Sequence, residues 1–232
     1  MSELISYQLE GSIATIAMDD GKANVLSLEM LSQIDAALDR AAADRALVVL
    51  TGREGIFSGG FDLRAFGTGR QTIASMLRAG FELAERILSF PMPVVIACSG
   101  HAVAMGVFLL LSGDYRLGAA GPYKITANEV AVGMTVPSAA VEICRQRLAP
   151  AHFHRAMILA EVYSPDDAIA AGFLDQVVAG SDLANEARGI ATRLSKLDMD
   201  AHSATKMTAR DHALTAIRAA IEADQAAFQA RA

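Results

Sequence analysis

Two glycine-containing segments each follow a short apolar run of the kind that forms a buried strand. The first is Phe57-Ser58-Gly59-Gly60-Phe61-Asp62-Leu63, after residues 46–50, and the second is Ser99-Gly100-His101-Ala102-Val103-Ala104-Met105-Gly106, after residues 94–97. Turns at strand ends present backbone N–H groups at the edge of a sheet where ligands of α/β proteins collect. The two segments therefore predict an α/β protein with a ligand site between two glycine turns.

The rest of the chain alternates predicted strands and helices. Residues 5–18 read as a two-strand hairpin, Ser27 caps a helix, and strands at 46–51 and 94–98 are separated by a helix at 72–89. After a helix at 106–111 the pattern is mainly helical, with helices at 138–148, 151–160, 165–171, 183–197 and 202–230 and a short strand at 175–178. This order predicts a mostly parallel sheet, and 232 residues fit one domain.

The charge pattern bears on partners and location. The formal net charge is -6 with basic residues scattered along the chain, so we expect no nucleic-acid partner. Residues 94–113 contain no Asp, Glu, Lys or Arg, but prolines before them and Ser99-Gly100-His101 within them favour a buried strand and helix over a membrane span. Two unpaired cysteines and the start Met1-Ser2-Glu3-Leu4 predict a cytoplasmic protein with reduced thiols.

Glu129 is the candidate base. It lies in a nearly uncharged stretch, and burial between apolar neighbours would raise its pKa toward the range useful for proton transfer. Two N–H donors and one base suit an enolate derived from a thioester. His152 and His154 form the closest His pair, but on a helix they point about 200° apart, so we expect no metal site.

Over nearly its whole length the chain resembles the crotonase, or enoyl-CoA hydratase/isomerase, superfamily. The first segment is similar to the family's Phe-Ser-Ala-Gly-x-Asp-Leu signature. The second, continued by Asp114-Tyr115-Arg116, is similar to its Asn-Gly-x-Ala-x-Gly-Gly-Gly turn. The resemblance implies a ββα spiral core at residues 1–200 and a C-terminal helical trimerisation arm of the same domain at 201–232. It also implies a homotrimer or a hexamer built as a dimer of trimers.

The resemblance also implies the site. The oxyanion hole for the thioester oxygen would be formed by the N–H groups of Gly59 and Met105, and Glu129 would be the catalytic residue. An acyl-CoA thioester would be the substrate, with coenzyme A as part of it and no separate cofactor. Contacts to CoA or substrate would come from Lys22, Ala23, Asn24, Gly60, Phe61, Asp62, Leu63, Gly106 and Phe108.

Phe108 departs from the hydratase pattern. Hydratases of this family carry a glutamate there and a second one at the position of Glu129, and the pair activates one water. One carboxylate suffices to move the double bond of a 3-enoyl-CoA to the 2-position through a dienolate, a step of fatty-acid β-oxidation. Family isomerases resemble this chain in their apolar residue and in Asn128-Glu129 with Pro137 eight residues on. We therefore expect an isomerase. The alternatives are a hydratase (a lyase) or other crotonase-type acyl-CoA enzyme, and a non-catalytic acyl-CoA-binding oligomer.

Overall fold

A six-stranded sheet forms the centre of the molecule. The computed structural model describes residues 3–67 and 69–230. The strand order is β1-β2-β3-β5-β7-β9, namely Ile5–Glu10, Ile13–Met18, Leu47–Thr51, Val94–Cys98, Tyr115–Ala119 and Gln176–Val178. Strands β1 and β2 form the predicted antiparallel hairpin, and every later neighbour pairs parallel. The predicted mostly parallel sheet is therefore confirmed.

A second, smaller sheet accompanies the first. Its strands are β4 (Gly55–Ser58), β6 (Gly100–Val103) and β8 (Ile125–Thr126), in that order and all parallel. In three successive units the chain adds a strand to the large sheet, then one to the small sheet, and then turns into helical structure. This arrangement is the ββα spiral that the resemblance implies.

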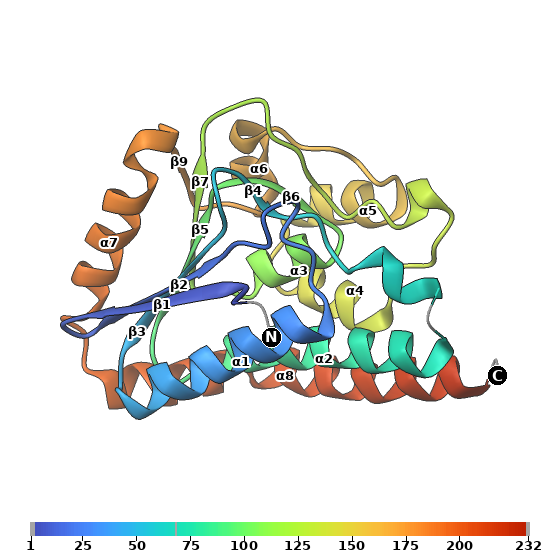
Figure 1. Ribbon diagram of the computed structural model, residues 1–232, viewed down its shortest axis with the longest axis horizontal. Coiled ribbons are helices and arrows are strands. Elements are labelled where there is room, and N and C mark those ends of the chain that lie inside the picture. The colour runs from blue at the N-terminus through green and yellow to red at the C-terminus, as the bar shows by residue number, and fades with distance from the viewer. Residues whose placement is uncertain (1–2, 68, 231–232) are drawn as a thin grey trace.

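Both faces of the central strands of the large sheet are buried. One face carries Val48, Leu50, Val94 and Ile96 into the main core. The other face carries Val49, Val95 and Leu117 against α7 (Leu183–Leu194), the helix at the left of Figure 1. Apolar residues on both faces explain why these strands read as continuous apolar runs in the sequence.

The helices lie mostly below and to the right of the sheets in Figure 1. Those not yet named are α1 (Leu28–Ala43), α2 (Arg70–Ser89), α3 (Met105–Leu111), α4 (Ser138–Arg145), α5 (Pro150–Ile158), α6 (Pro165–Ala171) and α8 (Met199–Ala230), with 3-10 turns η1 (Leu63–Gly67), η2 (Val130–Val132) and η3 (Gly180–Asp182). The long α8 packs along α2 and α4 of its own chain. The predicted arm boundary at residue 200 falls inside this helix, and residues 231–232 of the arm lie outside the described residues.

Local capping signals set several helix ends as expected. Ser27 accepts the N–H of Met30 at the start of α1, and Ser164 accepts the N–H of Asp167 at the start of α6. The helix at 183 has no such signal: Ser181 lies in the 3-10 turn η3, and α7 begins after Asp182 without a side-chain cap. Strands β4, β6, β7 and β8 were not predicted, because they are short and form through pairing with distant strands.

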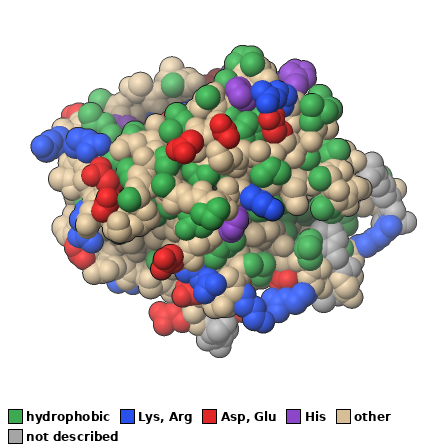
Figure 2. Space-filling model, turned by 90° about the horizontal axis from the view of Figure 1, so that it is seen from above, with side chains coloured by type: hydrophobic (Ala, Val, Ile, Leu, Met, Phe, Trp, Pro, Cys, Tyr) green, Lys and Arg blue, Asp and Glu red, His purple; other side chains and the backbone are tan. Residues whose placement is uncertain are grey.

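The surface mixes side chains of all kinds. On the face seen from above, acidic, basic and apolar side chains are interspersed (Figure 2). Several large apolar side chains are exposed, among them Val130, Val132 and Met134 in the loop after Glu129. Within the described ranges, none of the helices is both long and apolar enough to cross a membrane.

Candidate active site

The small sheet brings the three predicted parts of the site together. The ends of β4, β6 and β8 lead into Gly59, Ala104 and Ala127, respectively. These strands are hydrogen-bonded neighbours with parallel direction, so their carboxyl ends meet at one edge about 5 Å apart from strand to strand. The first glycine turn, the start of α3 and the segment that carries Glu129 therefore lie side by side.

A loop near the N-terminus braces the first turn. Gly59 donates its N–H to the carbonyl oxygen of Ala23 at 2.8 Å, so this N–H, predicted as the first oxyanion donor, is already engaged. Asn24 is fully buried, and its side-chain amide bonds to Met18, Ile56 and the backbone of Asp20. Asn24 thus shapes the loop through its side-chain amide. Its contact with CoA or substrate stays a prediction.

The N–H of Phe61 takes a different direction. The carbonyl of Gly60 accepts the N–H of Leu26 at 2.8 Å. Because the carbonyl and amide of a trans peptide point in opposite directions, the N–H of Phe61 points away from Leu26. A Cβ atom added at Gly60 would lie 3.5 Å from the nitrogen of Met105, so Gly60 and Met105 border the same space.

The N–H of Met105 points out of its helix. The carbonyl of Ala104 accepts N–H groups from within α3, at 2.9 Å from Val107 and 3.4 Å from Phe108. By the same trans-peptide geometry, the N–H of Met105 is directed away from the helix, toward the side where Gly60 lies. The backbone of Met105 is therefore oriented so that its N–H is free of the helix, and its role as the second oxyanion donor stays a prediction.

Glu129 is a buried carboxylate with an unsatisfied oxygen. The residue is 5% exposed, and its Oε2 atom has no hydrogen-bond partner. Burial raises the pKa of this carboxyl above its ordinary value. Its backbone carbonyl accepts the N–H groups of Val132 and Met134, which fixes the turn around it. Such a carboxylate is a stronger base than an exposed one.

An aromatic cluster fills the region of Phe108. Its ring centroid lies 6.1 Å from that of Phe81, which lies 6.2 Å from that of Phe61 in an edge-to-face contact. Phe108 is 1% exposed. Gly80 allows this packing, since a Cβ atom there would come within 2.5 Å of the Phe61 ring. The cluster leaves an apolar wall where a hydratase would place its second carboxylate.

The remaining predicted contacts differ in their surroundings. Lys22 and Leu63 are exposed, and Asp62 is paired with Arg64 at 2.9 Å, which holds the pKa of Asp62 below its usual value. Gly106 is packed against Ser58, whose carbonyl oxygen would be 2.6 Å from an added Cβ. Gly106 thus lets α3 approach β4, and the side chain of Leu63 extends to solvent.

One buried polar atom was missed by the sequence analysis. The hydroxyl oxygen of Thr126 is buried and without a partner, three residues before Glu129. Nothing in the local pattern distinguishes this threonine from an ordinary strand residue. Its orphaned oxygen became visible once β8 was placed against β6.

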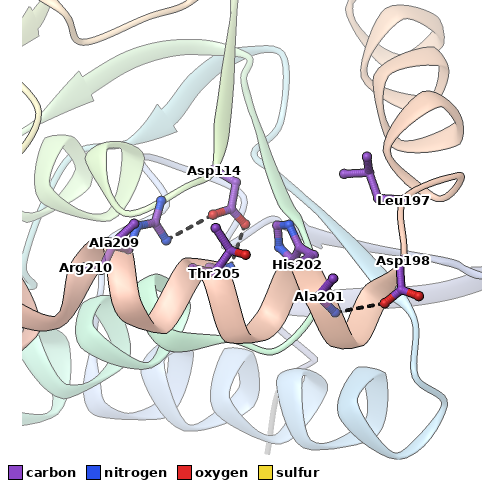
Figure 3. A pocket seen from close by; sticks show the side chains of 9 residues that line it. Asp114, Leu197, Asp198, Ala201, His202, Thr205, Ala209 and Arg210 are labelled. Carbon is purple, nitrogen blue, oxygen red and sulfur yellow. Dashed lines mark hydrogen bonds and ion pairs between the residues drawn. The ribbon is translucent and has the colours of Figure 1, made fainter.

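A groove on another part of the molecule contains none of these residues. It has a volume of about 460 Å³ and runs along α8, where Arg210 and Asp114 point toward one another (Figure 3). None of the predicted site residues lines it. Across residues 3–67 and 69–230 there is no cluster of three His, Cys, Asp or Glu side chains arranged to hold a metal ion.

Comparison with known proteins gives consistent matches. The family model described as enoyl-CoA hydratase/isomerase matches residues 8–231. The chain is 29% identical over 195 residues to mouse mitochondrial enoyl-CoA delta isomerase 1, covering 82% of this chain and 68% of that protein. It is 27% identical over 197 residues to a carnitinyl-CoA dehydratase of Salmonella paratyphi A, covering 84% and 75%. A solved structure of a Mycobacterium tuberculosis enoyl-CoA isomerase is 47% identical, with a TM-score of 0.93 over 97% of this chain and 99% of that one.

Proposed function

Because this chain belongs to the enoyl-CoA hydratase/isomerase family, we propose that it is an enoyl-CoA isomerase that converts a 3-enoyl-CoA to the 2-enoyl-CoA. The observation that carries the proposal is the buried carboxylate of Glu129 on the segment after β8, at the sheet edge where β4 and β6 lead to the N–H groups of Phe61 and Met105, with Phe108 in an apolar wall. Relatives named as isomerases are among the matches and support this choice.

The thioester oxygen binds between two N–H groups in this mechanism. Met105 supplies one donor, and Phe61 replaces Gly59 as the other, because the N–H of Gly59 is engaged by Ala23. Both N–H groups are held in fixed directions before the substrate reacts, and they stabilise the negative charge that develops on the thioester oxygen. A donor of this kind is worth roughly 3–4 kcal/mol in the transition state.

Glu129 moves one proton. Its carboxylate removes a proton from C2 of the substrate, and the electron pair of that C–H bond delocalises over C2–C4 and the thioester oxygen. The same group, now a carboxylic acid, returns the proton to C4, so the double bond ends between C2 and C3. The raised pKa of Glu129 narrows the gap to the carbon acid and aids the first step.

Exclusion of water keeps the dienolate on this path. The buried rings of Phe81 and Phe108 leave no polar partner for a water on that wall, and one carboxylate cannot both hold and activate it. Exposed Lys22 and the backbone of Ala23 stand beside the first turn and would contact the CoA portion of the substrate. No separate cofactor enters these steps.

Assembly and location extend the proposal. Val130, Val132 and Met134 are 45%, 60% and 38% exposed in the loop that follows Glu129. Burial of these side chains against another copy would favour the expected trimer or hexamer. A cytoplasmic role in fatty-acid β-oxidation stays a prediction.

Hydration is the second candidate function. The orphaned oxygens of Thr126 and Glu129 lie on one segment, and a water held by both would allow addition to a 2-enoyl-CoA. The hydroxyl of Thr126 is not a second acid, so the expected hydration rate is lower than the isomerisation rate.

The test compares two substrates. Purified protein is incubated with 3-enoyl-CoA and, separately, with 2-trans-enoyl-CoA, while double-bond migration and water addition are followed. We expect migration that falls by at least about 10³-fold in Glu129→Gln, because the base is removed. Glu161→Gln, which alters a partly buried carboxylate paired with Arg155, is the matched control and should retain migration. Fast hydration with slow migration would instead favour the second candidate, and silence on both substrates would leave acyl-CoA binding without turnover.

A further inference from the structure

Ala104 has a backbone conformation that residues with a side chain rarely adopt. Its φ is 51° and its ψ is −125°, far from the left-handed helical region that alanine visits occasionally. The chain places this residue directly before Met105, the proposed donor. A glycine would adopt the same backbone conformation without strain. The alanine therefore lowers the stability of the fold, and its packing gives no reason for it.

The neighbouring hydrogen bonds hold Ala104 in place from both sides. Its N–H donates to the carbonyl of Thr126 at 3.0 Å, continuing the pairing of β6 with β8. Its carbonyl accepts the N–H of Val107 at 2.9 Å inside α3. The strained residue is therefore clamped between a strand and a helix, and the peptide that follows it has one orientation.

The methyl group of Ala104 borders the space in front of the donor. A Cβ atom added at Gly60 would lie 2.9 Å from the Cβ of Ala104 and 3.5 Å from the nitrogen of Met105. The methyl group of Ala104 and the nitrogen of Met105 thus both lie close to Gly60, where a side chain would clash with the methyl group and with the carbonyl oxygen of Val103 at 3.0 Å. An apolar flank beside an N–H group excludes water that would compete for it.

We propose that Ala104 is a positioning residue of the oxyanion hole. Its methyl group shields the N–H of Met105 from water, and its strained, clamped backbone restricts the direction of that N–H. This inference rests on the proposed function, since it assigns a role at the same site. Glycine at position 104 would relax the backbone but would open the flank and widen the range of ψ at the donor peptide.

The test compares two alanines of positive φ. Ala104→Gly alters the site, and Ala160→Gly is the matched control, because Ala160 has a φ of 49° in the segment after α5. Both variants are expected to melt a few degrees higher, since glycine relieves the strain. Ala104→Gly should lower kcat about tenfold with KM changed less than twofold, whereas Ala160→Gly should leave both unchanged.

A second measurement does not depend on turnover. Infrared difference spectra of bound hexanoyl-CoA, a saturated thioester, report how strongly the hole polarises the carbonyl. We expect a downward shift of the carbonyl frequency in the native protein, a smaller shift in Ala104→Gly and a retained shift in Ala104→Ser, which keeps a Cβ atom. An unchanged shift and kcat in Ala104→Gly, or a loss of activity together with a lower Tm, would overturn the inference.

The two measurements separate the inference from the proposed function. If the native protein polarises hexanoyl-CoA but does not turn over 3-enoyl-CoA, and Ala104→Gly weakens the polarisation, the inference holds and the isomerase proposal fails. If the native protein isomerises but Ala104→Gly behaves like Ala160→Gly, the inference fails and the isomerase proposal stands. Absence of any carbonyl shift in the native protein overturns both.

Discussion

Lys206 joins α8 to the rest of the fold, and its replacement by methionine should destabilise the protein strongly. Its Nζ atom donates to Asp114 at 2.7 Å and to the carbonyls of Phe90 at 2.8 Å and Met92 at 3.3 Å. The side chain is 4% exposed. These contacts connect the N-terminal part of α8 with the end of α2 and the turn before β5, beside the groove of Figure 3.

The expected loss follows from the groups left behind in Lys206→Met. Two buried carbonyls lose a donor, at roughly 1–3 kcal/mol each. Asp114 keeps Arg210 at 3.0 Å and the N–H of Val94 at 2.7 Å, so its charge is not left unpaired. The free energy of unfolding should therefore fall by about 3 kcal/mol, which is the lower end of the range for breaking a buried ion pair. For a domain of this size that corresponds to a Tm lower by about 6–12 °C.

Thermal unfolding followed by circular dichroism measures this effect. Asp200→Asn is the control on the same helix, because it breaks the exposed ion pair between Arg45 and Asp200, whose side chains are 69% and 93% exposed. Exposed pairs add little to stability, so its Tm should barely change. A Tm for Lys206→Met within about 2 °C of the native value would refute the reasoning that these contacts anchor α8.

Three further changes test the site and its supports. Glu129→Gln should stabilise the protein by about 1 kcal/mol at pH 8 and by nothing at pH 4. Burial raises the pKa of Glu129 in the folded protein, so the native protein loses stability as pH rises from the pKa of the unfolded state through that of the folded state. An equal increase in Tm for Glu129→Gln at both pH values would contradict this. Gly106→Ala should lower the free energy of unfolding by about 1–3 kcal/mol and abolish isomerisation, because its Cβ atom would lie 2.6 Å from the carbonyl oxygen of Ser58. Full activity at the native Tm would show that α3 can move to make room for the methyl group. Asp224→Ala removes the acceptor of two N–H groups at the start of α4 and should cost about 1 kcal/mol in urea unfolding, a loss that Asp224→Asn should largely restore.

Local signals in the sequence predicted the helices well but not the short strands. Ser27 and Ser164 mark helix starts through caps formed within three residues, so a reader of the sequence can place α1 and α6. Strand β6 lies inside a segment that reads as a turn, because its glycine and small residues carry no alternating pattern. It becomes a strand through pairing with β4 and β8, which are distant in sequence.

The same division applies to the candidate site. The apolar residues around Glu129 allowed either a solvated or a desolvated carboxylate, and the structure shows that it is buried. The choice between Gly59 and Phe61 as donor was not accessible from the sequence. It depends on peptide directions set by Ala23 and Leu26, which pair with the turn across more than thirty residues. The resemblance identified the first glycine turn as the source of a donor, and the hydrogen bonds favour the N–H of Phe61 over that of Gly59.

Buried side-chain atoms without partners occur in several places, including nitrogens of Arg147, His152 and His202, but at the end of the small sheet two such oxygens lie beside a strained residue. Two buried charged side chains in the fold, Lys206 and Arg116, are matched by acidic partners and backbone carbonyls, as expected for groups that support folding. At the end of the small sheet, by contrast, Glu129 and Thr126 leave buried oxygens without partners, and Ala104 beside them is strained. Each of these features lowers stability by itself, and their convergence at the ends of β6 and β8 has no explanation in packing. In the groove along α8 the Nε2 atom of His202 also lacks a partner, but the Asp114 carboxylate there is paired with Lys206 and Arg210. We therefore place the chemistry at the ends of β6 and β8, where the unpaired carboxylate oxygen of Glu129 would receive the transferred proton.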